Sequence, residues 1–137
     1  DVYKRQHLTT IQLKMWYDSL NVFVSGVSAE GWGFMQHESM ACGRPVIAAK
    51  YAGLCEFMSE NNSFCIDYKE VPSTGYWENA GAKWSKFDEE HLIETMRYAY
   101  NNPNIVKKKG LLASQNVSKF SITNFIDNIY NIIDIYN

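Results

Sequence analysis

Three short apolar segments constrain the fold of this 137-residue chain more than any other feature. Asn21–Ser25 and Pro45–Ala49 are rich in β-branched residues, as strands buried on both faces of a parallel sheet are. Ser63–Asp67 is a third candidate strand, and segments with helical character lie between the three. Strands and helices that alternate in this way are typical of a right-handed β-α-β wind. The sequence therefore predicts an α/β protein with helices flanking a parallel sheet.

Helices are predicted on both sides of the first two strands. In 8–20 the apolar residues Leu8, Ile11, Met15 and Leu20, with Trp16 beside them, approximate a helical stripe. A second helix is expected over Phe34–Cys42, because Gly43 suits a left-handed C-terminal cap and Pro45 a stop. Leu54–Met58 is expected to form a short helix.

The C-terminal half predicts three more helices. Asp88 is a good N-cap for a helix that ends near Asn101, and Phe87 and Leu92 occupy hydrophobic-staple positions. Asn102 and Pro103 supply a cap and a first-position proline for the next helix, which Gly110 weakens. The last helix starts near Thr123, and its apolar face carries Phe125, Ile129, Ile132, Ile133 and Tyr136.

The segment 68–87 has no clear periodicity and contains Pro72, Gly75 and Gly81. We expect a long loop there that folds back on the domain, because Trp77 and Trp84 are too bulky to leave in water. The run Lys107-Lys108-Lys109 is expected to lie on a solvated helix face.

Composition limits the possible partners and compartment. The net charge of −2 and pI near 5.9 argue against nucleic acid as a partner. No apolar run has the roughly 18 residues that a membrane span needs. Cys42, Cys55 and Cys65 lack metal-site spacing, so we expect three buried thiols and a cytoplasmic location, with membrane association left to parts outside this chain.

We expect the chain to consist of a short boundary segment and one domain. Residues 1–6 lack periodicity and are interpreted as a non-native or boundary segment. Residues 7–137 are expected to form one domain, since 46% hydrophobic and 15% aromatic residues suffice for a core.

The candidate site is the loop Glu30-Gly-Trp-Gly33. It follows the carboxyl end of a predicted parallel strand and precedes a helix, which is where open α/β sheets bind ligands. Gly31 and Gly33 allow a ligand to approach the backbone, and the free N–H groups at the start of the next helix suit a phosphate. An ordinary tight turn is the alternative.

Two carboxylates frame the loop, Glu30 before it and Glu38 about one turn into the helix. Ionised carboxylates only accept hydrogen bonds, so the pair is suited to hold two sets of vicinal hydroxyls, such as a hexose and a ribose. The alternative is that Glu30 is a solvated or helix-terminal acid and Glu38 an exposed helix residue. His37 lacks a second ligand at metal spacing, which favours a helix-face role over a donor contact.

The run from Glu30 to Ile47 resembles the signature of the family 4 retaining glycosyltransferases, which have the GT-B fold with Rossmann-like domains. The family pattern is E-G-[FW]-G followed by E-A-M-A-C-G-x-P-V-I, with seven residues between its glutamates; Glu30 and Glu38 match both. Residues 52–56 are similar to the family's G-G-x-x-E, although Ala52 replaces its first glycine.

The resemblance implies a partial C-terminal, nucleotide-sugar-binding domain whose parent transfers a hexose-type sugar to a carbohydrate or lipid-linked acceptor with retention of configuration. Glu30 would support the reacting centre, Glu38 would bind the ribose, and Gly31, Trp32, Gly33 and Phe34 would line the donor site. The nucleotide sugar would be a substrate, with no cofactor and no metal. The acceptor would bind a missing N-terminal domain, so the isolated piece is expected to be inactive. A nucleotide-sugar epimerase, a phosphorylase and a non-catalytic binding module remain as alternatives.

Overall fold

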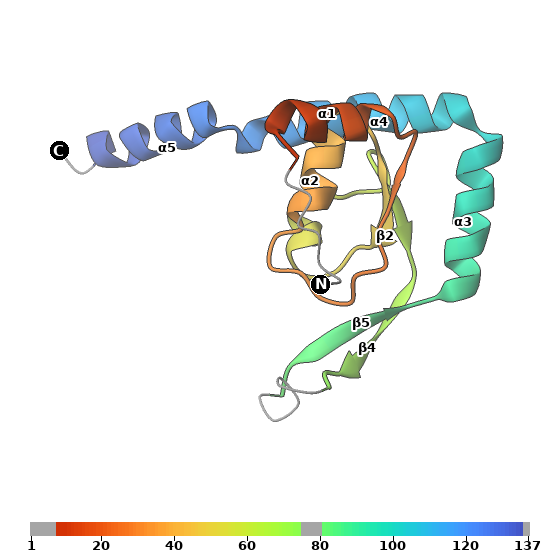
Figure 1. Ribbon diagram of the computed structural model, residues 1–137. Coiled ribbons are helices and arrows are strands. Elements are labelled where there is room, and N and C mark those ends of the chain that lie inside the picture. The colour runs from red at the N-terminus through yellow and green to blue at the C-terminus, as the bar shows by residue number, and fades with distance from the viewer. Residues whose placement is uncertain (1–7, 75–80, 136–137) are drawn as a thin grey trace, which may run out of the picture.

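The computed structural model describes residues 8–74 and 81–135 (Figure 1). Its elements are, in chain order, helix α1 (Thr10–Asp18), strand β1 (Phe23–Val24), helix α2 (Phe34–Ala41), strand β2 (Val46–Ala49), 3₁₀ helix η1 (Ala52–Glu56), strands β3 (Phe64–Ile66), β4 (Tyr68–Pro72) and β5 (Lys83–Phe87), helices α3 (Glu89–Asn101) and α4 (Pro103–Val117), 3₁₀ helix η3 (Ser118–Phe120) and helix α5 (Ile122–Ile135).

The three predicted strands form one parallel sheet in the order β1-β2-β3. Phe23 pairs with Val46, and Ile47 pairs with Phe64, so β2 is the central strand. All four residues of β2 are buried, as expected for a strand covered on both faces. The prediction of an α/β fold with a Rossmann-like parallel sheet and flanking helices is confirmed.

Successive residues of β2 enter two separate cores. Val46 and Ala48 pack in a cluster that includes Met40 of α2, Leu54 of η1 and Ala113 of α4. Ile47 and Ala49 belong to a second cluster on the other face, together with residues of β3, α3 and α4. Because side chains alternate along a strand, this pattern places α2 and α3 on opposite faces of the sheet.

Helix α1 forms as predicted, but its buried face is not the apolar stripe seen in the sequence. Thr9 and Gln12 form a capping box at its start. Ile11 and Met15 are 75% and 65% exposed, whereas Tyr17 is 2% exposed. The helix thus packs through Tyr17, and most of its aliphatic side chains face solvent.

The predicted long loop over 68–87 is wrong, because β4 and β5 form an antiparallel hairpin there. Tyr68 pairs with Phe87 and Val71 with Trp84, and the hairpin extends away from the parallel sheet (Figure 1). The N–H of Ser85 donates to the Ser28 carbonyl at 2.8 Å, which ties β5 to the loop after β1. Trp77, the other aromatic residue of the prediction, lies outside the described residues.

Helices α3 and α4 begin close to their predicted positions. The Asp88 carboxylate accepts from the N–H of His91, which confirms the cap, and Pro103 is the first residue of α4. Asn102 does not cap α4 through its side chain; its amide instead donates to the Tyr98 carbonyl. Gly110 is buried where α4 crosses the end of α2, and a Cβ there would lie 2.1 Å from the Gly43 carbonyl oxygen. Close packing of α4 against the turn that follows α2 therefore explains the mid-helix glycine.

Two predictions about polar side chains are wrong in part. Lys107 and Lys108 are exposed as predicted, but the Lys109 ammonium donates to the carbonyls of Glu60 and Ser63 and lies over the Phe64 ring. The thiols are not all buried either, since Cys55 is exposed on η1 while Cys42 and Cys65 are half-buried. Both errors arise because a helix or turn presents its side chains to several neighbours that the local sequence does not specify.

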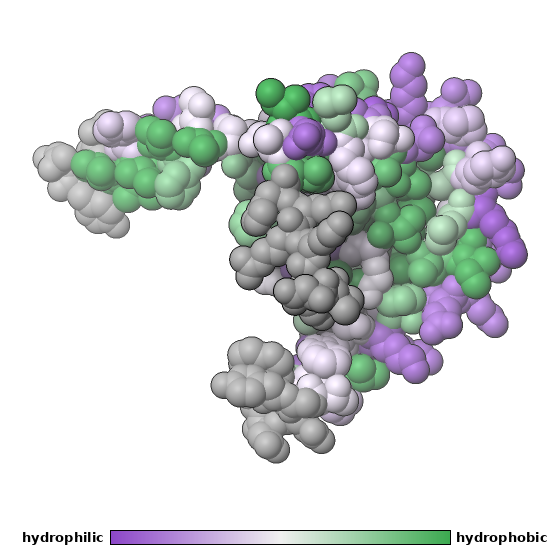
Figure 2. Space-filling view, viewed as in Figure 1, coloured by the Kyte–Doolittle hydropathy of each residue, from purple (hydrophilic) through white to green (hydrophobic). Residues whose placement is uncertain are grey.

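Helix α5 projects from the body of the domain beyond η3 (Figure 1). Phe125, Ile129, Ile132 and Ile133 confirm the predicted apolar face, and all four are exposed; Tyr136 lies outside the described residues. Figure 2 shows these apolar side chains gathered along the helix. Among residues 8–74 and 81–135, no helix combines the length and apolar character that crossing a membrane requires.

Candidate active site

The site predicted from sequence lies in the loop between β1 and α2, at the carboxyl edge of the parallel sheet. Gly33 is the N-cap of α2 and has a left-handed backbone, with φ of 86° and ψ of 58°. No side chain of a described residue caps this helix, so its first N–H groups are suited to a ligand.

Two glycines hold the loop against the start of η1. A Cβ on Gly33 would lie 2.3 Å from the Leu54 side chain, and a Cβ on Gly53 would lie 2.2 Å from the Gly31 carbonyl oxygen. Both distances are below any normal contact, so neither position tolerates a side chain without displacement of its neighbours. The two sequence motifs, 30–33 and 52–56, therefore form one structural unit.

The turn that carries Gly53 includes a strained residue. Ala52 has φ of 50° and is the non-glycine residue with positive φ in the described part of the chain. This is the position where the resembling family has a glycine, and the left-handed region costs an L-residue about 1–2 kcal/mol. A glycine at this position would adopt the same backbone without that cost.

The Trp32 side chain points into the domain. Its ring packs against His37, Phe57 and Phe120, with centroid distances of 5.8, 5.4 and 5.0 Å. What Trp32 offers to a ligand is therefore its backbone, while its indole anchors the loop. Phe34, the next predicted site residue, is 71% exposed at the first turn of α2.

Glu30 and Glu38 meet different neighbours. Glu30 borders a small depression that is also lined by Tyr51, Leu54 and Ser85, and its carboxylate forms no hydrogen bond or ion pair with another described residue. Glu38 lies on the α1 side of α2, where its Oε2 accepts a hydrogen bond from the Tyr17 hydroxyl at 3.0 Å. Glu30 is therefore open to a ligand, and Glu38 is held by a second helix.

Two other α2 residues near the loop are polar and covered. Gln36 is 1% exposed, and its amide donates to the Ser25 hydroxyl at 2.8 Å, which joins the end of β1 to α2. His37 is half-buried in the aromatic cluster, and burial lowers its pKa. Its Nε2 is buried without a partner among the described residues, consistent with a neutral ring. The helix-face role predicted for His37 agrees with this position.

Sequence reasoning missed Tyr17 and Gln36. Tyr17 forms a helical stripe with Leu13 and Leu20, at spacings of four and three residues, and this stripe would have indicated the covered face of α1. No pattern in the sequence indicates that Gln36 would pair with Ser25.

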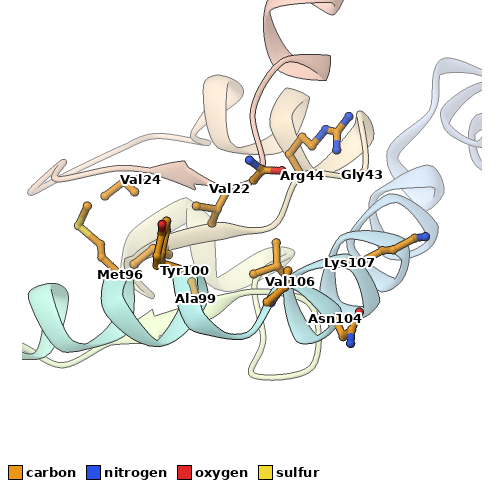
Figure 3. Close-up of a pocket in the computed structure, with 13 residues that line it drawn as sticks. Val22, Val24, Gly43, Arg44, Met96, Ala99, Tyr100, Asn104, Val106 and Lys107 are labelled. Carbon is orange, nitrogen blue, oxygen red and sulfur yellow. The ribbon is translucent and has the colours of Figure 1, made fainter.

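A separate groove among the described residues does not coincide with this site. It measures about 800 Å³ and runs along the free edge of β1, between that strand and helices α3 and α4 (Figure 3). Val22, Val24, Met96 and Tyr100 line it, whereas none of the six predicted site residues does. The loop is the better candidate for a polar ligand, because of its position at the carboxyl edge of the sheet and its free N–H and carboxylate groups. Within the described residues, no three His, Cys, Asp or Glu side chains gather as a metal site.

The fold and the site together define a class: a Rossmann-like α/β domain with a glycine loop and two acidic residues at the carboxyl edge of its sheet. Residues 4–74 match the family described as glycosyl transferases group 1, which is just over half of the chain. The protein belongs to this glycosyltransferase family. A search among curated proteins gave no match.

Proposed function

We propose that this chain binds the nucleotide-sugar donor of a retaining glycosyltransferase that transfers a hexose-type sugar to a carbohydrate or lipid-linked acceptor. The observation that carries the proposal is the joined unit of residues 30–33 and 52–54. It leaves the Glu30 carboxylate and the start of α2 open at the carboxyl edge of the sheet.

Each part of the donor has a candidate partner. The diphosphate would accept hydrogen bonds from the N–H groups at the start of α2, where the helix dipole also favours negative charge. Glu30 would accept from hydroxyls of the transferred sugar and support the charge that develops at the reacting carbon. Glu38 would accept from the ribose hydroxyls. Membership of the glycosyltransferase family and the match of both glutamates to the retaining signature support this assignment.

The proposal gives this chain the donor side of the reaction and places the acceptor on a second domain. Turnover is therefore expected only when both are present, and no metal or cofactor enters the scheme. Rapid sugar transfer by the 137-residue chain alone would contradict this division of roles.

The first test is donor binding by the 137-residue chain, measured by calorimetry with UDP-glucose, UDP-N-acetylglucosamine and GDP-mannose. Glu38→Gln should weaken binding of the preferred donor by about 1–3 kcal/mol, because a charge-assisted hydrogen bond is lost. Glu94→Gln on exposed α3 is the matched control and should leave affinity unchanged. Failure of every donor to bind, or equal affinities in the two variants, would refute the proposal.

The second test concerns the reaction. In a polypeptide that joins this chain to an acceptor domain, Glu30→Ala should abolish transfer, and proton NMR of the wild-type product should show the donor's anomeric configuration. An inverted product would exclude the retaining mechanism while leaving donor binding intact. Epimerised donor, or phosphorolysis of a glycan, would favour the epimerase or phosphorylase alternatives.

A further inference from the structure

We propose that Tyr17 is a positioning residue that fixes the Glu38 carboxylate for the ribose of the donor. This inference rests on the proposed function, because it assigns Tyr17 a role through Glu38. Tyr17 lies outside the sequence signature, on a helix that precedes β1.

The contact joins a buried side chain of α1 to a half-buried side chain of α2. The Tyr17 hydroxyl donates to Glu38 Oε2 at 3.0 Å. The Tyr17 side chain is 2% exposed, and its ring packs edge-on against Trp16 and Phe23, with centroid distances of 4.8 and 6.2 Å. Close packing restrains the ring, so its hydroxyl is held beside α2.

The protonation states fix the direction of the hydrogen bond. Burial, together with the hydrogen bond to Glu38, raises the pKa of the Tyr17 phenol above its ordinary value. The phenol therefore keeps its proton, and an ionised carboxylate can only accept. Tyr17 thus donates this hydrogen bond and restrains one oxygen of Glu38.

A second contact keeps the two helices in register. The guanidinium of Arg44, which follows α2, donates to the Asp18 carbonyl at the end of α1 at 2.8 Å. Because Asp18 is next to Tyr17, this bond limits sliding of α1 along α2. Two hydrogen bonds therefore set the position of the phenol relative to Glu38.

The restraint leaves the other carboxylate oxygen for a ligand. Glu38 is half-buried and forms no further side-chain hydrogen bond with a described residue. A carboxylate with one oxygen held and one open presents a fixed acceptor to vicinal hydroxyls, which lowers the entropy lost on binding. The expected result is selectivity for a ribose that carries both hydroxyls.

The experiment compares the affinities of UDP and GDP with those of their 2′,3′-dideoxy forms, by calorimetry on the 137-residue chain. The variants are Tyr17→Phe, Glu38→Ala and the double variant, with Tyr100→Phe on exposed α3 as the matched control. Tyr17→Phe keeps the ring and removes the hydroxyl. Within each protein, the Kd of the dideoxy form is divided by the Kd of the ribose form. A reduced folded fraction changes both values equally, so it cancels in this ratio.

In the wild type the ratio should be at least about tenfold, and Tyr17→Phe should reduce it about five- to tenfold. In the Glu38→Ala background the Tyr17 substitution should have no further effect, because the two residues act as one unit. Tyr100→Phe should keep the wild-type ratio. Glu38→Asp retains the charge but shortens the side chain by one methylene, so it should lower the ratio as Tyr17→Phe does.

The outcomes separate this inference from the proposed function. If Glu38→Ala changes the ratio but Tyr17→Phe does not, or if Tyr17→Phe weakens both nucleotide forms equally in both backgrounds, the positioning role is refuted and the donor site stands. The positioning role also fails if Glu38→Asp keeps the wild-type ratio. If Glu38→Ala leaves the ratio unchanged, or the wild type binds no nucleotide, the ribose site itself is refuted.

Discussion

Helices α2 and α5 differ in what covers them. In α2 the side chains of Gln36, Ser39 and Met40 are buried, although two of the three are polar. In α5 the aliphatic and aromatic residues form a continuous face, and this face is exposed. Amphipathic patterning thus identifies the apolar face of a helix, whereas burial depends on neighbours elsewhere in the chain.

The largest expected effect compares one apolar residue from each helix. Met40 is 0% exposed, so Met40→Ala should cost about 2–5 kcal/mol of unfolding free energy through lost burial and a cavity. Phe125→Ala, at 63% exposure on α5, should change it by less than about 0.5 kcal/mol. Urea denaturation followed by circular dichroism measures both. Similar losses in the two variants would show that α5 packs against the domain in solution.

The next effect concerns the loop that starts α2. Gly53→Ala places a Cβ against the Gly31 carbonyl and should destabilise the domain by about 1–3 kcal/mol. Gly31→Ala is the paired substitution, because nothing lies within 4 Å of its added Cβ, and the stability should stay within about 0.5 kcal/mol. The same denaturation assay applies. Equal stabilities for the two variants would mean that the loop and η1 are not in close contact.

A smaller change, of opposite sign, is expected at Ala52. Ala52→Gly should stabilise the protein by about 0.5–1 kcal/mol, because relief of the left-handed strain exceeds the extra entropy of the unfolded chain. Ala41→Gly at the exposed end of α2 should instead destabilise it by up to about 1 kcal/mol. Melting temperatures of the two variants measure both changes. A loss of stability in Ala52→Gly would contradict the inference that Ala52 is strained.

The smallest effect is the pH dependence from His37 on α2. Burial lowers the pKa of His37 below its ordinary value of 6.5, so just below pH 6.5 the unfolded chain binds more protons than the folded one. The stability from the neutral ring is therefore complete above pH 6.5 and is lost as the pH falls toward the folded pKa. The nearby Glu38 carboxylate opposes this shift. In His37→Leu the slope of the unfolding free energy against pH, between pH 7 and 5, should decrease. An unchanged slope would mean that other groups cause the pH dependence.

Local signals predicted the parallel sheet and most of its helices. Buried β-branched runs defined β1 and β2, and caps such as Asp88 and Gly43 act within a few residues. The β4–β5 hairpin was not predictable in this way. All residues of strands β4 and β5 except Val71, Trp84, Ser85 and Phe87 are exposed, so the strands have no clean apolar alternation, and Lys69 pairs with Lys86. Its anchor is the tertiary bond from Ser85 to Ser28.

The candidate site shows the same division. The sequence pattern predicted the loop, and the structure places it at the carboxyl edge of the sheet, while the roles of Glu30 and Glu38 stay predictions. The neighbours of that loop came from elsewhere: Tyr17 from α1, Phe120 from η3 and Gly53 from η1. These contacts depend on how the helices pack, which no local pattern specifies.

The contact between Gly53 and the Gly31 carbonyl also defines what can be transplanted. A designer who grafts residues 30–33 onto another α/β scaffold would transfer only one of the two segments that shape the loop. Residues 52–54 would have to be grafted with them, in the same relative placement, or the host must offer a backbone segment without side chains at that position. The smallest portable module is therefore a discontinuous pair of segments.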